Sequence, residues 1–136
     1  MSEITVKADD SMLEAVQDFI HQQIEDLCTD MKLLMQIDLA VEEIFVNIAH
    51  YAYAPQTGEA TIICNLNKET REMQIIFSDS GKPFNPLDRD EPDVTLPAEE
   101  RGIGGLGIFL TKKYMDEVSY EYSGGKNNLT LKKTLP

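Results

Sequence analysis

The chain has 136 residues, 42% hydrophobic and 26% charged, a composition typical of one globular domain. Its net charge of −12 argues against direct binding along a nucleic-acid backbone, which needs clustered lysine and arginine. The sequence has no apolar run of membrane-spanning length and no signal-peptide pattern at its start, so we expect a cytoplasmic protein that does not contact membranes. Cys28 and Cys64 lie far apart and outside any C-x-x-C pattern, which favours two buried thiols over a disulfide or a metal site.

The first half of the chain predicts one strand and two helices. Residues 1–7 alternate polar and apolar side chains, as a half-buried strand does. Ser11 and Glu14 have the spacing of a capping box, which predicts that Ser11 is the N-cap of the first helix. Asp30 can cap a second helix, and apolar residues at helical spacing then continue over 31–53.

The second half predicts two hairpins separated by a helix. Residues 60–66 and 72–78 are rich in strand-forming side chains and are joined by a short polar segment. A second pair of such runs covers 117–122 and 128–133, and an amphipathic helix over 108–115 precedes it. Helices segregated from hairpins indicate an α+β fold: a two-layer sandwich with a mixed, mostly antiparallel sheet and helices on one face.

The segment between Ser80 and Arg101 is the least regular part of the sequence. It contains an acidic series and four of the six prolines, so it cannot form a regular helix or strand. A loop of this length is uncommon inside a compact domain unless it is a lid, a binding loop or disordered.

A glycine cluster follows that irregular segment and leads directly into the predicted helix. Glycine allows backbone N–H groups to approach an anion closely, and the first turn of a helix offers N–H groups without intrahelical partners. The pattern favours a phosphate site, although glycine clusters also form ordinary loops. In a chain this acidic, a bound polyphosphate needs a cation such as Mg²⁺ or nearby basic groups. The cluster comprises Gly102, Gly104, Gly105 and Gly107, with Leu106 before the last glycine.

Glu43 and Asn47 lie four residues apart on the second predicted helix, so both project from one face. The amide oxygen of Asn47 could bind Mg²⁺, and Glu43 could orient or deprotonate a nucleophile. Alternatively, Glu43 belongs to a solvated helix face beside Glu42.

Asp79 ends a predicted strand, and Gly81 allows a tight turn directly after it. A carboxylate there can accept a hydrogen bond from an exocyclic amine such as that of adenine. An aspartate in an ordinary turn after a strand is the simpler alternative.

Taken in order, these motifs resemble those of the GHKL ATPase superfamily. The stretch 105–118 is similar to the one shared by anti-sigma factor serine/threonine kinases of bacterial partner-switching systems. The resemblance covers nearly the whole chain. The motifs are Glu43-x-x-x-Asn47, then Asp79-x-Gly81-x-Pro83, then Gly102-x-Gly104-Gly105-x-Gly107.

The resemblance implies a single ATP-binding kinase domain over 1–136. Glu43 would be the catalytic base or orienting group, and Asn47 the Mg²⁺ ligand. Asp79 would bind the adenine amine, with Gly81 making room for the ring. Residues 82–104 would form the ATP lid.

The remaining implied nucleotide contacts come from the glycine cluster and its surroundings. Gly102, Gly104, Gly105 and Gly107 would approach the phosphates. The expected binding segment also includes Pro83, Arg101, which could reach the γ-phosphate, Leu106, and Thr130, which would place a hydroxyl near adenine.

The implied activity is phosphorylation of a small STAS-domain anti-anti-sigma factor by Mg-ATP, together with sequestration of a sigma factor by a homodimer. One alternative is a binding module that uses nucleotide to set its conformation and grips a protein without physiological phosphotransfer. An acidic α+β domain without a ligand is the second alternative.

Overall fold

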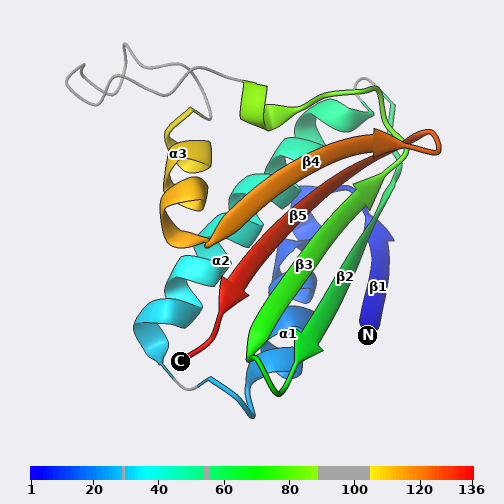
Figure 1. Cartoon of the computed structure of the whole chain (residues 1–136). Coiled ribbons are helices and arrows are strands. Elements are labelled where there is room, and N and C mark those ends of the chain that lie inside the picture. The colour runs from blue at the N-terminus through cyan, green and yellow to red at the C-terminus, as the bar shows by residue number, and fades with distance from the viewer. Residues whose placement is uncertain (29, 54–55, 89–104) are drawn as a thin grey trace.

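The computed structural model describes residues 1–28, 30–53, 56–88 and 105–136. Five strands form one sheet in the order β1-β2-β3-β5-β4, and every neighbouring pair is antiparallel (Figure 1). This arrangement confirms the predicted α+β class and both predicted hairpins. The strands are β1 (Ser2–Lys7), β2 (Glu59–Asn67), β3 (Glu72–Asp79), β4 (Glu117–Ser123) and β5 (Lys126–Thr134).

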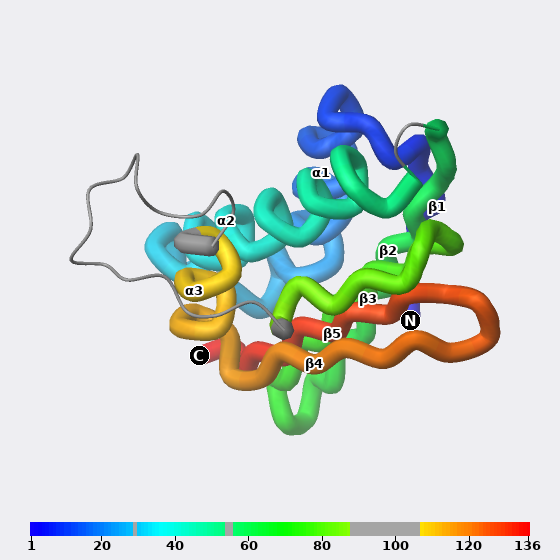
Figure 2. The backbone as a smooth tube through the Cα atoms, turned by 90° about the horizontal axis from the view of Figure 1, so that it is seen from above, coloured from blue at the N-terminus to red at the C-terminus, as the bar shows by residue number. Residues whose placement is uncertain are grey.

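The three α-helices lie together on one face of the sheet, as Figure 2 shows from above. None of the helices in the described parts of the chain is long and apolar enough to cross a bilayer. The second helix reaches as far as its sequence pattern predicts, because a π-helical segment extends its C-terminal end. The helices are α1 (Leu13–Ile24), α2 (Met31–Asn47) and α3 (Gly105–Tyr114), with short helical segments η1 (Asp10–Met12), η2 (Ile48–Ala52, π) and η3 (Pro86–Asp88).

The two predicted helix caps have different outcomes. Asp30 is the N-cap of α2, as predicted, and its Oδ1 accepts hydrogen bonds from the backbone of Lys32 and Leu33. The capping box at Ser11 is wrong, because its backbone N–H donates to Asp9 Oδ1 over 2.9 Å and Ser11 lies inside η1. A more N-terminal carboxylate therefore caps a short helical turn there.

The core fills the space between the helices and the helix-facing side of the sheet. Phe45 of α2 and Phe77 of β3 are its largest fully buried side chains. Cys28 and Cys64 are free and buried, as the sequence predicts. Burial raises the pKa of the Cys64 thiol from its ordinary 9.0 to about 11, because the thiolate loses its hydration.

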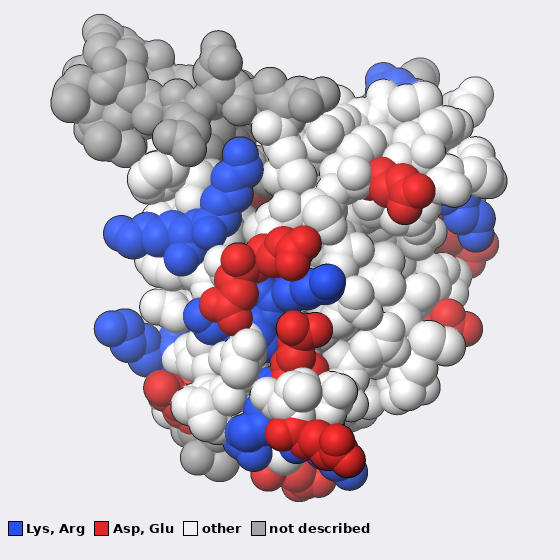
Figure 3. All heavy atoms as spheres, in the orientation of Figure 1, with Lys and Arg blue, Asp and Glu red and all other residues white. Residues whose placement is uncertain are grey.

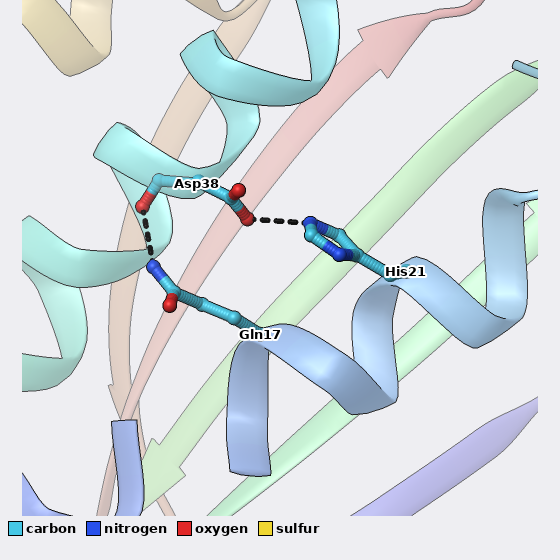
Figure 4. Close-up of polar contacts among 3 residues, drawn as sticks. All are labelled: Gln17, His21 and Asp38. Atoms are coloured by element: carbon cyan, nitrogen blue, oxygen red, sulfur yellow. Dashed lines mark hydrogen bonds and ion pairs between the residues drawn. The ribbon is translucent and has the colours of Figure 1, made fainter. Parts of the chain in front are cut away.

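Polar contacts fix α1 against α2 (Figure 4). His21 Nε2 lies 2.7 Å from Asp38 Oδ1, and Gln17 Nε2 donates to the backbone oxygen of Asp38 over 3.2 Å. Both α1 side chains thus meet the same residue of α2. The contact helps to set the position of α2, the helix that carries Glu43 and Asn47.

Candidate functional site

A pocket that is partly open to solvent lies between the C-terminal end of α2, η2 and the sheet. Its walls include apolar side chains from both layers, among them Ile44, Ile48, Phe77 and Leu129. A few polar side chains line the same space. Apolar walls with few polar groups are typical of pockets that bind a flat organic ring.

Asp79 supplies the buried carboxylate of this pocket. The residue ends β3 and is 6% exposed. Its Oδ1 accepts hydrogen bonds from the backbone N–H of Gly81 over 2.9 Å and from Asn127 Nδ2 over 3.0 Å. Because both of these bonds use Oδ1, Oδ2 is the oxygen that can accept from a ligand. An acceptor held in this way recognises a donor such as an amino group.

Gly81 allows two segments of backbone to meet beside the pocket. A Cβ at this position would lie 2.2 Å from the carbonyl oxygen of Ala52, the last residue of η2. The next residue, Lys82, donates its backbone N–H to that same oxygen over 3.0 Å. In the structure, the room that Gly81 provides is therefore occupied by the backbone of η2. The expectation that it makes room for an adenine ring stays a prediction.

Asn127 of β5 is a site residue that the sequence reasoning missed. It is 6% exposed and lines the pocket. Its Nδ2 donates to Asp79 Oδ1 and to the carbonyl oxygen of Lys82, each over 3.0 Å. Its Oδ1 accepts from the backbone N–H of Phe84 over 3.1 Å and from the Tyr120 hydroxyl. One carboxamide thus joins β5 and β4 to the segment that follows β3.

Thr130 does not line this pocket, contrary to the expectation that it places a hydroxyl near adenine. Asn127, Leu129 and Leu131 are the buried positions of β5, and they alternate with more exposed ones. Successive side chains of a strand point to opposite faces, so Thr130 lies on the face of the sheet away from the helices. Asn127 is the one polar residue among these buried positions of β5. The alternation of buried and exposed residues along the strand is the sequence signal that could have identified it.

Glu43 and Asn47 are in contact, as their spacing predicts. Asn47 Nδ2 donates to Glu43 Oε1 over 3.0 Å, and Asn47 lines the pocket. A Cβ at Gly107 would lie 2.0 Å from Glu43 Oε2, so the first turn of α3 rests against this carboxylate. The structure therefore brings the helix motif and the last glycine of the cluster together, beside the pocket that contains Asp79.

The residues at this end of α2 suit a magnesium ion that is shared with a ligand. Since the amide nitrogen of Asn47 is bonded to Glu43, its Oδ1 is the atom that can bind a hard cation. The described residues contain no group of three or more His, Cys, Asp or Glu side chains able to hold a metal by themselves. Mg²⁺ is commonly held by one or two protein oxygens together with phosphates and waters, which fits this donor set.

Several predicted contacts cannot be placed. Arg101, Gly102 and Gly104 lie outside the described residues, as does most of the predicted lid over 82–104. Gly105 and Leu106 are described only as the first two residues of α3. Pro83 is exposed and is not part of the pocket lining.

Comparison with known proteins agrees with the fold and the motifs. A family model described as a histidine kinase-like ATPase domain matches residues 6–133. The serine/threonine-protein kinase BtrW of Bordetella bronchiseptica is 28% identical over 100 residues, which are 74% of this chain and 70% of that protein. The serine-protein kinase RsbW of Bacillus cereus is 28% identical over 116 residues, which are 84% of this chain and 66% of that protein. RsbW of Bacillus mycoides is 29% identical over 98 residues, which are 69% of this chain and 60% of that protein.

These matches confirm the resemblance that the ordered motifs carry. The chain spans roughly two thirds of the length of these relatives. Their names are those of serine or serine/threonine protein kinases. With a family model matched over nearly its whole length, the chain belongs to the histidine kinase-like ATPases of the GHKL superfamily.

Proposed function

We propose that this protein is a serine/threonine protein kinase that transfers phosphate from Mg-ATP to a small STAS-type antagonist, and that it also sequesters a sigma factor as a homodimer. The kinase names of its relatives support the activity. The observation that carries the proposal is the buried Asp79 carboxylate, held by Gly81 and Asn127 in the pocket that Asn47 also lines. Neither the Asn47 motif nor the Asp79 motif alone would support nucleotide binding, but the presence of both in one pocket supports it.

In this proposal, ATP binds with its base in the apolar part of the pocket and its amino group donating to Asp79 Oδ2. The triphosphate then extends toward Asn47 and the N-terminal end of α3. Backbone N–H groups and the helix dipole at that end stabilise negative charge. Asn47 Oδ1 would hold Mg²⁺, whose charge would offset part of the repulsion between the phosphates and a chain of net charge −12.

Glu43 is the proposed base. Its carboxylate accepts the proton of the acceptor serine or threonine as the hydroxyl oxygen bonds to the γ-phosphorus. The bond between that phosphorus and the β–γ bridging oxygen breaks, and ADP leaves with the electron pair. Most of the rate enhancement comes from positioning and charge stabilisation, since phosphoryl transfer requires little covalent participation by the protein.

The proposal is tested with Glu43→Gln and the matched control Glu42→Gln, a change in the exposed neighbouring carboxylate. Radiolabelled ATP is incubated with candidate STAS-domain acceptors, and ATP affinity is measured separately by calorimetry. Glu43→Gln should bind ATP but transfer phosphate about 100-fold more slowly or worse, and Glu42→Gln should behave as wild type.

Two outcomes contradict the proposal in different ways. Undiminished transfer by Glu43→Gln would show that Glu43 is not the base. Tight ATP binding by the wild-type protein without transfer to any acceptor would instead support the nucleotide-dependent binding module. Asp79→Ala separates the nucleotide site from the chemistry, because it should abolish ATP binding itself.

A further inference from the structure

The outward face of α2 carries an exposed row of large apolar side chains. Met31, Met35 and Leu39 are 70%, 66% and 41% exposed. They follow one another at intervals of four residues, so they form a continuous ridge about 12 Å long, called here the α2 ridge. In the described residues, no other single helix or strand carries three exposed large hydrophobic side chains.

The α2 ridge is not needed to form the core. A different face of the helix packs inward, through residues that include Leu33, Ile37 and Val41. Clustered apolar side chains on a surface are typical of protein contact sites. Two of the three are methionines, whose flexible side chains adapt to a partner's shape.

A shallow, open groove lies beside the N-terminal half of α2. Lys32, Gln36 and Lys133 contribute to its lining. Asp30 lines it too, but its Oδ1 is bonded to the first turn of α2, and Lys133 lies 3.4 Å from Asp116. Asp116 thus offsets part of the charge of Lys133, and Lys32 is the main positive charge of the groove next to the apolar ridge.

Further positive charge comes from α3, which packs against α2. Lys112 and Lys113 in its last turn are both exposed. Figure 3 shows basic side chains gathered along the side of the molecule that carries α3, at the left of the view. Together with Lys32 and Lys133, these are four of the twelve basic residues in a chain of net charge −12. Two acidic side chains are exposed at the ends of the ridge, Asp30 before Met31 and Glu42 after Leu39.

We propose that the α2 ridge and the lysines beside it bind an acidic amphipathic helix of a partner protein. A partner helix can present apolar side chains one turn apart, which matches the spacing of the ridge. Acidic residues at the edge of that helix would meet Lys32, Lys112 and Lys133. The strongly acidic remainder of the surface would repel an acidic partner elsewhere, which fixes where it docks.

Charge argues against two other occupants. A second copy docked ridge to ridge would set the lysines beside one ridge near the lysines beside the other. An anionic membrane would repel a chain of net charge −12. The proposal does not depend on the proposed kinase activity, because the ridge begins at Met31 whereas Asn47 and the nucleotide pocket lie at the opposite end of α2.

The test uses a fluorescein-labelled helical peptide of about 20 residues, with leucines one turn apart and glutamates flanking them. A second peptide has lysines in place of the glutamates. Fluorescence anisotropy should show that only the glutamate peptide binds. Met35→Glu should weaken this binding at least about tenfold. Lys32→Glu should weaken binding of the glutamate peptide less than Met35→Glu does. The factor by which Lys32→Glu weakens binding should be smaller at high salt, because salt screens the charge interaction.

Lys68→Glu is the matched control, since Lys68 is exposed in the turn between β2 and β3 and should leave binding unchanged. Each variant is also checked for an unaltered melting temperature and ATP affinity, which separates loss of this surface from loss of the fold or the nucleotide site. Failure of the glutamate peptide to bind, or equal binding by Met35→Glu, would overturn the proposal. So would a dimer mass that Met35→Glu reduces to a monomer, or wild-type binding to anionic vesicles that Met35→Glu abolishes.

Discussion

Replacing Asn127 with alanine tests whether one buried carboxamide holds the nucleotide pocket together. The side chain is 6% exposed, and it connects β5 to the segment after β3 through Asp79, Lys82 and Phe84. It also accepts a hydrogen bond from the Tyr120 hydroxyl. Alanine removes all of these bonds and leaves one buried partner, Asp79, and three partly buried ones without them.

The expected loss follows from the burial of those partners. A hydrogen bond contributes about 1 kcal/mol net, and a buried group left without its partner costs about 1–3 kcal/mol. The bond to Asp79 is buried, whereas those to Lys82, Phe84 and Tyr120 are only partly buried, so water entering the pocket can replace some of them. We therefore expect a loss of about 3 kcal/mol in the free energy of unfolding. For 136 residues this lowers the melting temperature by about 10 °C.

Thermal and urea unfolding measure this loss, and calorimetry measures ATP affinity, which should fall about tenfold as Asp79 becomes less well held. Asn128→Ala is the matched control, because its Nδ2 donates to the carbonyl oxygen of Lys126 in an exposed position. That variant should unfold within about 0.5 kcal/mol of wild type. If Asn127→Ala melted within about 2 °C of wild type, or if both variants lost equal stability, the proposed role of Asn127 would be refuted.

Three further predictions concern single positions. Gly81→Ala should abolish ATP binding in calorimetry, because its Cβ would lie 2.2 Å from the Ala52 carbonyl oxygen and backbone atoms cannot swing away. Gly107→Ala should lower phosphate transfer at least about tenfold while changing ATP affinity less, because its Cβ would displace the Glu43 carboxylate; equal losses in both assays would contradict this. Cys64 is buried and its pKa is raised from 9.0 to about 11, so at pH 8 it should be alkylated at least about 100-fold more slowly than an exposed thiol, because both its thiolate fraction and its access to reagent are reduced; mass spectrometry can follow this reaction. Its pKa shift should also make stability fall as pH rises from 9.0 toward 11, because the unfolded chain loses the thiol proton first.

The helices, strands and two hairpins of the fold were predictable because their signals are local, whereas the pairing of β1 with β2 and of β3 with β5 joins distant segments and was not predicted. Helical periodicity over 31–53 and two pairs of strand-forming runs determine the elements, and short connections make hairpins of the strands. The capping at the start of α1 was not predictable from spacing alone, because the short helix η1 precedes α1 and the N-cap of α1, Met12, makes no side-chain capping bond. Ser11 and Asp9 both lie before α1 and both can accept backbone hydrogen bonds, and in the structure Asp9 does so as the N-cap of η1. Competing caps two residues apart are decided by backbone geometry that the sequence does not specify.

In the site too, contacts within one element were predictable, and contacts between distant elements were not. Glu43 and Asn47 share one helix, so their spacing alone places them in contact. Asn127 and Asp79 are 48 residues apart, and they meet because they are paired in the register of β3 and β5. Choosing between Asn127 and Thr130 requires the phase of β5, since a shift of one residue exchanges the faces of a strand. The prediction of Thr130 as a pocket residue therefore assigned the wrong set of alternate β5 residues to the pocket-facing side of the sheet.

Helix α2 has a consequence for how its two ends communicate. It runs for 17 residues without interruption, about 25 Å, from the first residue of the α2 ridge to the proposed magnesium ligand. If such a helix moves as a rigid body, a tilt at one end also moves the other end, and no conformational change in between is required. If ATP tilts α2 and thereby changes the affinity of a partner at the ridge, that partner must change ATP affinity by the same factor, because coupling between two binding equilibria is reciprocal.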